Sequence, residues 1–353
     1  MDSPAPAPTV TPTGTRPSAA PVAVSLGDPA GIAPELIAEA WLQRRAAGLS
    51  PFFAVGGALT LGMAAASRGH TLPVRQIERP AQALEIFEEA LPVLGDADCA
   101  PQFGAPDEAG ARLALHSLTE ATDLARTGAA GAVVTGPIAK ARLATVGFAH
   151  PGQTEFLAEA CALGPDDAVM MLAGPNLRTV PLTVHEPLAR VPGLITPELI
   201  THKARIVARA LVRDFGLVAP RIAITGLNPH AGEDGRMGEE EIHVIAPAIA
   251  QLQAEGLAVT GPHPADALFA AHERSGYDVA LCMYHDQALI PIKTLDFDAG
   301  VNVTLGLPII RTSPDHGTAF GIAGRNIASP GAMIAALRMA GECAARRAAG
   351  LLP

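Results

Sequence analysis

Three histidines each follow, directly or within a few residues, an apolar run that is typical of a buried strand. They are His185, His230 and His285. The carboxyl ends of parallel strands share one edge of a sheet, so three imidazoles that are distant in sequence can converge there. Neutral imidazole binds Zn²⁺, Co²⁺ and similar cations, and three protein ligands leave positions open for a substrate. The pattern therefore predicts a divalent-metal site formed by these three side chains.

An acidic residue lies within three positions of each histidine. These residues are Glu186, Glu233 and Asp286. A carboxylate that accepts a hydrogen bond from a ligating imidazole fixes the orientation of the ring. Acidic residues in loops are equally often solvated side chains without such a role, and the sequence leaves both interpretations open.

Three polar side chains suited to an anion follow the last of these histidines. Lys293, Asn302 and Arg311 lie on segments separated by two glycines and a proline, so the backbone can turn between them. Arginine offers a planar fork and lysine a point charge to phosphate or carboxylate oxygens. We expect the ammonium, the amide and the guanidinium to meet on short segments and bind an anionic substrate.

The segment 151–157 is a loop that leads into a helix, and it carries Gln153 and Thr154. Backbone N–H groups and the helix dipole at such a point favour an anion, which these two side chains would help to hold. The alternative is a helix cap made by Thr154. The residues alone favour the cap.

Composition excludes several classes of protein. The chain has 353 residues, 49% of them hydrophobic, which is enough for one large or two medium domains. A formal charge of -10 without a Lys/Arg cluster argues against nucleic-acid binding. No apolar run approaches the ~18–20 residues of a membrane span.

The cysteines are scattered without a Cys-x-x-Cys pair, which fits a reducing cytoplasm. They are Cys99, Cys161, Cys282 and Cys343.

Strand and helix patterns alternate along most of the chain. Strands are predicted at 22–26, 51–55, 132–135, 169–173, 178–184, 221–225 and 279–283, and helices at 34–45, 58–67, 107–127, 196–213 and 238–255, with a rigid turn at 261–266. This alternation predicts a largely parallel, doubly wound α/β sheet. The turn at 27–35 lacks the Gly-x-Gly-x-x-Gly dinucleotide fingerprint.

From about residue 22 to residue 348 the sequence resembles the family of 4-hydroxythreonine-4-phosphate dehydrogenase. The motifs that carry the likeness are Gly-Asp-Pro-Ala-Gly-Ile at 27–32, Thr-Gly-Pro at 135–137, Gly-Leu-Asn-Pro-His-Ala-Gly-Glu at 226–233, Tyr-His-Asp-Gln at 284–287 and Gly-Val-Asn-Val-Thr-Leu-Gly-Leu-Pro at 300–308. The family's metal-binding histidines fall on His185, His230 and His285. Its substrate-binding residues fall on Thr154, Lys293, Asn302 and Arg311, and Gln153 replaces a substrate-contacting histidine.

The resemblance also implies a fold and an assembly. It implies a three-layer α/β/α fold like that of isocitrate and isopropylmalate dehydrogenases, with two domains and the active site in the cleft. Residues 22–135 with 310–353 would form the cofactor domain, and residues 136–309 the metal, substrate and dimer domain. Residues 1–21 would be a disordered extension. A cytoplasmic homodimer is expected, with the metal site shared between subunits.

The implied reaction is the oxidation of 4-phosphooxy-L-threonine by NAD⁺ or NADP⁺ with a divalent metal such as Zn²⁺, Mg²⁺ or Co²⁺. The product, 2-amino-3-oxo-4-phosphooxybutanoate, would decarboxylate to 3-amino-2-oxopropyl phosphate in pyridoxal 5'-phosphate biosynthesis. The acceptor of the hydroxyl proton stays open between metal-bound hydroxide, Lys293 and Asp286.

Other functions remain in view. Gln153 is also compatible with a sister dehydrogenase that acts on 4-phospho-D-threonate, 4-phospho-D-erythronate or a dihydrodiol dicarboxylate. Three histidines could also serve a metal-dependent hydrolase, but no His-Glu-x-x-His is present. A catalytically silent binding protein would have little use for the metal triad.

Overall fold

The computed structural model describes residues 19–350, so the predicted N-terminal extension lies almost wholly outside the described residues. Within that range the strands form one twelve-stranded sheet in the order β3-β4-β2-β1-β5-β12-β11-β6-β7-β10-β8-β9. The strands are β1 Val22–Ser25, β2 Phe52–Val55, β3 Val74–Ile77, β4 Leu91–Leu94, β5 Ala132–Thr135, β6 Val169–Ala173, β7 Arg178–Pro181, β8 Ile222–Thr225, β9 Val259–His263, β10 Val279–Cys282, β11 Val301–Leu305 and β12 Arg311–Pro314.

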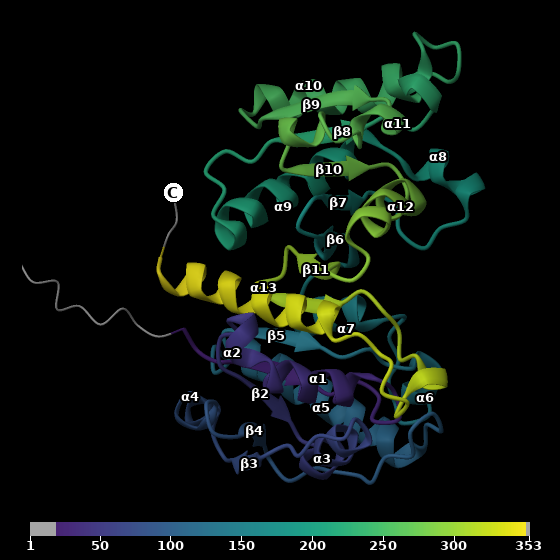
Figure 1. The fold of residues 1–353 in the computed structure, drawn as a ribbon. Coiled ribbons are helices and arrows are strands. Elements are labelled where there is room, and N and C mark those ends of the chain that lie inside the picture. The colour runs from purple at the N-terminus through teal and green to yellow at the C-terminus, as the bar shows by residue number, and fades with distance from the viewer. Residues whose placement is uncertain (1–18, 351–353) are drawn as a thin grey trace, which may run out of the picture.

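The sheet consists of two parallel halves joined through an antiparallel centre. From β3 to β12 all neighbouring strands are parallel, and so are those from β7 to β9. Between the halves, β11 runs antiparallel to β12 and β6, and β6 runs antiparallel to β7. Figure 1 shows the result as two lobes with β6 and β11 between them. The predicted largely parallel sheet is confirmed in each half.

Helices cover both faces of the sheet. They are α1 Ala33–Leu42, α2 Arg44–Ala47, α3 Ala58–Ser67, α4 Ala83–Ile86, α5 Glu108–Arg126, α6 Lys140–Ala144, α7 Gln153–Ala160, α8 Val191–Leu194, α9 Pro197–Phe215, α10 Ala246–Ala254, α11 Ala265–Leu268, α12 His285–Asp296 and α13 Gly331–Ala348. Helices α1, α9, α10 and α13 pack on one face, and α5, α7 and α12 on the other. The three-layer α/β/α prediction is therefore confirmed.

Local sequence explains where the long helices begin. Asp107 caps α5 by accepting a hydrogen bond from the N–H of Gly110 at 2.7 Å, and the Thr196 hydroxyl caps α9 in the same way. Caps of this kind satisfy N–H groups that have no partner inside the helix. Helix α9 ends at Gly216, whose φ of 71° is left-handed and suits glycine.

A buried carboxylate ties α9 to α13. Asp214 is 6% exposed and accepts hydrogen bonds from Arg213 at 2.9 and 3.0 Å and from Arg347 at 2.6 and 3.0 Å. Burial raises the pKa of Asp214, but the hydrogen bonds from Arg347 and Arg213 outweigh burial and leave this pKa below its ordinary value. The carboxylate is therefore charged at neutral pH and joins the two helices.

Three local predictions were wrong. The segment 261–266 is not only a turn, because its first half belongs to β9. The helix at 34–45 divides at Gln43 into α1 and α2. The helix at 238–255 begins with a π-helical turn, Glu241–Ile245, before α10. In the first case Gly261 and Pro262, which are typical of turns, lie inside a strand whose pairing with β8 overrides that local preference.

Candidate active site

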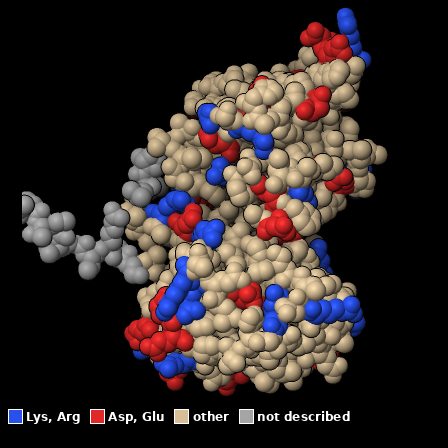
Figure 2. All heavy atoms as spheres, in the orientation of Figure 1, with Lys and Arg blue, Asp and Glu red and all other residues tan. Residues whose placement is uncertain are grey.

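A pocket of about 800 Å³ lies between the two lobes. Its lining comes from both halves of the sheet: the segment after β5, the start of α7, the loop after β7, helix α12 and the paired strands β11 and β12. The molecule narrows at this level, and acidic and basic side chains are interspersed over the face shown in Figure 2. That face carries no large patch of one sign.

The central antiparallel strands form the floor of the pocket. Their register places Asn302 opposite Ser313 and Thr304 opposite Arg311. Side chains alternate along a strand, so these four lie on one face of the sheet. On the other face the Thr312 hydroxyl donates a hydrogen bond to the Ala336 carbonyl of α13 at 2.9 Å. The residues predicted to bind an anion, Asn302 and Arg311, thus lie on the face of the central strands opposite α13.

Arg311 is the most buried cation of the pocket, with 3% of its surface exposed. Its Nε and Nη2 donate to the Thr135 hydroxyl at 3.2 and 2.8 Å, and Nη1 donates to the Thr304 hydroxyl at 3.0 Å. Nη2 also donates to Gln153 Oε1 at 2.8 Å. Burial lowers the pKa of Arg311 to about 10, and the nearby Glu155 carboxylate opposes this effect. The guanidinium therefore stays charged at neutral pH.

Gln153 completes this cluster. Its Oε1 also accepts a hydrogen bond from the Thr135 hydroxyl at 2.8 Å, and its Nε2 donates to the Gly136 carbonyl at 2.9 Å. The favoured interpretation of Thr154 as a helix cap is wrong: Gly152 is the cap residue of α7, no side chain caps the helix, and Thr154 lines the pocket. Helix α7 thus starts earlier in the chain than a Thr154 cap would allow.

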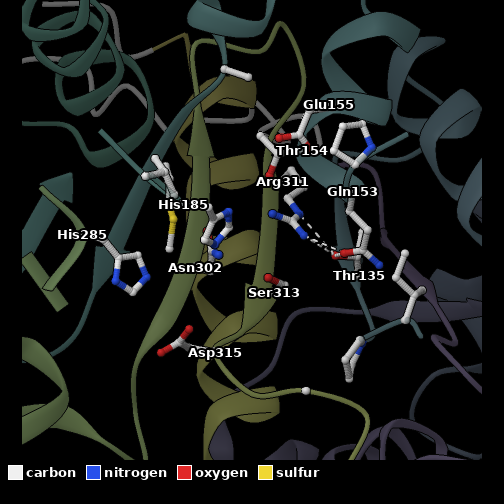
Figure 3. A pocket seen from close by; sticks show the side chains of 18 of the residues that line it. Thr135, Gln153, Thr154, Glu155, His185, His285, Asn302, Arg311, Ser313 and Asp315 are labelled. Atoms are coloured by element: carbon white, nitrogen blue, oxygen red, sulfur yellow. Dashed lines mark hydrogen bonds between the residues drawn. The ribbon is translucent and has the colours of Figure 1, made fainter. Parts of the chain in front are cut away.

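Two of the three predicted metal ligands meet in the pocket. His185 and His285 have ring centroids 5.8 Å apart, and they follow β7 and β10, which are adjacent and parallel. The His285 Nδ1 lies 2.7 Å from Asp286 Oδ1, the contact that would orient this ring. Figure 3 shows both histidines on one side of the pocket, with Arg311 on the other side and Asn302 between.

His230 lies outside this pocket. It follows β8, next to β10 in the sheet, but its side chain is 64% exposed and its nearest acidic contact is Glu233 at 3.7 Å. Its φ of 51° is left-handed, a conformation uncommon in residues other than glycine. Across residues 19–350, no three His, Cys, Asp or Glu side chains are grouped to hold a metal ion. The three-histidine site stays a prediction, and a single chain supplies two of its members.

Lys293 and Asn302 line the same pocket but belong to different elements. Lys293 is on α12, not on a short segment as expected, and its Nζ lies 2.9 Å from Asp315 Oδ2. Asn302 is on β11, and its buried Oδ1 has no hydrogen-bond partner in the part of the chain that the structure describes. A buried amide oxygen without a partner is costly unless a ligand occupies the site.

Sequence reasoning missed several residues that shape the site. Thr135 belongs to the Thr-Gly-Pro motif, yet nothing in that motif indicates that its hydroxyl bonds the guanidinium. Thr304 was identifiable by strand alternation from Asn302. Lys203, which comes from α9, also lines the pocket. A lysine within an amphipathic helix gives no sequence signal that it is buried.

The donor set suits the groups that the sequence predicts. Two imidazoles beside a carboxylate are typical ligands for a divalent cation. The pocket is also lined by Pro137, Lys140 and residues 315–317, and its volume of about 800 Å³ is large enough for a second ligand. Among the described residues no helix is both long and apolar enough to cross a membrane.

The similarity to known proteins, in sequence and in structure, extends over almost the whole chain. The family model described as "Pyridoxal phosphate biosynthetic protein PdxA" matches residues 50–340. The 4-hydroxythreonine-4-phosphate dehydrogenase of Erythrobacter litoralis is 65% identical over 93% of this chain and 98% of its own length. That of Zymomonas mobilis is 52% identical over 93% of this chain and 97% of its own.

Solved structures give the same result. The 4-hydroxythreonine-4-phosphate dehydrogenase of Klebsiella pneumoniae superposes with a TM-score of 0.81 at 36% identity, covering 92% of this chain and 99% of that one. A terephthalate 1,2-cis-dihydrodiol dehydrogenase from Burkholderia xenovorans is also similar, with a TM-score of 0.63 at 28% identity over 91% of this chain and 97% of that one.

Proposed function

The chain belongs to the PdxA family of pyridoxal phosphate biosynthetic proteins, and we propose that it is a 4-hydroxythreonine-4-phosphate dehydrogenase that oxidises the C3 hydroxyl of 4-phosphooxy-L-threonine. The observation that carries this proposal is one pocket with a buried guanidinium on one side and a histidine pair on the other. The first suits a phosphate or carboxylate, and the second suits a divalent cation beside the oxidised carbon.

The phosphorylated substrate would be held by the cation cluster. Arginine has five N–H donors, and four hydrogen bonds hold Arg311 in place, so its orientation is set before a ligand arrives. Lys293, Thr154 and the Asn302 amide line the space in front of it. Donors positioned before binding give an anion more stabilisation than mobile surface charges, because little reorganisation is needed.

His185 and His285 would hold a divalent cation such as Zn²⁺, Mg²⁺ or Co²⁺, whose positive charge favours ionisation of the hydroxyl group. A nicotinamide cofactor, NAD⁺ or NADP⁺, would accept the hydride. We infer that a homodimer completes the site with His230 from a second copy. Exposed apolar side chains on and after α12 support such an interface: Ile290 is 63%, Leu295 39% and Phe297 76% exposed.

The test is formation of reduced nicotinamide cofactor with 4-phosphooxy-L-threonine, with and without EDTA, beside 4-phospho-D-threonate and 4-phospho-D-erythronate. Turnover that prefers the amino acid and disappears with EDTA supports the proposal. Turnover with the non-amino acids alone would assign the chain to a sister activity, for which Gln153 is the favouring observation. The absence of reduction with all three substrates would refute the dehydrogenase.

A further inference from the structure

Lys203 is a buried lysine in the wall of the active-site pocket. It lies on α9 and is 8% exposed. Its Nζ donates one hydrogen bond, to the Leu182 carbonyl at 2.8 Å. Within the described range, 19–350, it forms no ion pair. An ammonium group has three N–H donors, so two remain for a partner that the chain itself does not supply.

Burial of an ammonium group with two unused N–H donors is unfavourable unless a partner accepts their hydrogen bonds. Transfer of an isolated ammonium out of water is costly, and a buried lysine responds by losing its proton more readily. Burial accordingly lowers the pKa of Lys203, and the Asp166 carboxylate, on the turn before β6, opposes this effect only in part. Other titratable groups that line the pocket are His185 and Glu186, on the segment after β7, and His285 and Lys293, on α12. A buried lysine that gives up its proton more readily is a better proton acceptor than an exposed one.

The contacts of Leu182 place the amine beside the histidine end of the pocket. The Leu182 N–H donates to the Cys282 carbonyl at 2.7 Å, and Thr183 N–H donates to the Met283 carbonyl at 3.3 Å. These pairs join the ends of β7 and β10, from which the chain continues to His185 and to His285. Lys203 therefore reaches the pocket where the two strands that position the histidines end.

The two protein groups considered earlier as proton acceptors are less suited. Lys293 is 41% exposed at its side chain, and its Nζ is already paired with Asp315 at 2.9 Å. The Asp286 side chain is 70% exposed and bound to the His285 ring. Neither combines burial with free hydrogen-bonding capacity at the pocket wall.

We propose that Lys203 is the catalytic residue that accepts the proton of the C3 hydroxyl, an inference that rests on the proposed dehydrogenase function. As the C3–H bond breaks, hydride with its electron pair goes to the nicotinamide, the O–H proton goes to the neutral Lys203 amine, and the C3=O bond forms. The bond from C2 to the carboxylate then breaks, CO₂ leaves, and its electron pair stays on C2 and the carbonyl. The Lys203 ammonium returns the proton to C2, so the protons balance.

The test compares the Lys203→Met, Lys203→Arg and Lys203→Ala variants with the wild type, and Arg209→Met, an exposed arginine on the same helix, is the control. Loss of a general base is expected to lower kcat by about 10²–10⁴-fold with KM within a few fold of wild type. The arginine variant keeps the positive charge but cannot accept the proton, so K203R should be as impaired as K203M. R209M should match the wild type.

Chemical rescue keeps the proposal falsifiable if K203M folds poorly. Small primary amines should restore turnover to K203A, and the rescued rate should follow the pKa of the amine. In the wild type, kcat should fall as the pH drops and Lys203 becomes protonated. Wild-type turnover together with K203M activity within threefold of it, or with rescue independent of amine pKa, would overturn the role of Lys203. An inactive wild type would instead refute the proposed function itself.

Discussion

Gln153→Met removes the side chain that holds the buried guanidinium, without removing the cation. In the native structure Gln153 Oε1 accepts hydrogen bonds from Arg311 and Thr135, and its Nε2 donates to the Gly136 carbonyl. Methionine fills a similar volume but offers neither group. We therefore expect Gln153 to act mainly by positioning Arg311, because its amide is already engaged within the protein.

The size of the effect follows from the lost contact. A hydrogen bond to a charged group contributes about 1.5–3 kcal/mol, so Q153M should lose about that much stability or substrate affinity. Expressed in kcat/KM this is about 10- to 150-fold, at 1.36 kcal/mol for each factor of ten. The assay pairs steady-state kinetics on 4-phosphooxy-L-threonine with urea unfolding of the same preparation.

Gln153→Glu is the matched comparison. It keeps an acceptor for Arg311 but places a carboxylate in the anion site. Repulsion of a bound anion at about 5 Å, with an effective dielectric constant of about 20, amounts to about 3 kcal/mol. Q153E should therefore be closer to wild type than Q153M in unfolding, yet raise KM more. If both variants raise KM equally and leave unfolding unchanged, Gln153 contacts the substrate directly and the positioning argument fails.

Three further predictions concern assembly and stability. Mixing inactive His230→Ala and His285→Ala proteins should restore about a quarter of wild-type activity by forming heterodimers with one intact shared site; no recovery after subunit exchange would exclude a shared site. Asp214→Asn should lower the free energy of unfolding by about 3–5 kcal/mol, since two arginines lose a buried partner. Because the Asp214 pKa is depressed, its contribution to stability is present above the ordinary pKa of 3.8 and is lost as pH falls through the lower folded value, so the wild-type and D214N acid-unfolding curves should converge there. Gly27→Ala should destabilise the protein by about 1–3 kcal/mol, because φ is +68° and a Cβ would lie 2.5 Å from the Pro137 carbonyl; an unchanged melting temperature would contradict this.

Apolar runs made most of the fold predictable. The strand at 132–135 and the helix at 58–67 have the predicted bounds because a strand buried on both faces reads as continuous apolar sequence and a helix keeps its own period. Strand β12 escaped prediction because its four residues, Arg311–Pro314, are polar or proline and nevertheless buried. Its pairing with β11 satisfies the backbone, and that pairing is not visible in a local pattern.

The site was predictable in its residues more than in its geometry. Strand ends correctly indicated that the histidines follow neighbouring parallel strands, and His185 and His285 do meet. His230 does not join them, because the turn Pro229–Gly232 has a left-handed backbone at two non-glycine residues and leaves this side chain exposed. Lys203 could not be identified, because the burial of a helical lysine depends on the carbonyl that it reaches from another element.

A chain with a negative net charge can bind a phosphorylated acid if the cations that bind it are buried in the pocket. A high density of positive charge on the surface is then not needed. The net charge of -10 repels anions at long range, but screening weakens that field beyond about 8–10 Å in physiological salt. Within the pocket, the Arg311 guanidinium is 3% exposed, where solvent screens its charge least. Arg311 is held by four hydrogen bonds and stays protonated, whereas Lys203 has one and can release its proton. This difference in hydrogen-bond partners supports the proposals that Arg311 binds the anion and that Lys203 accepts the proton.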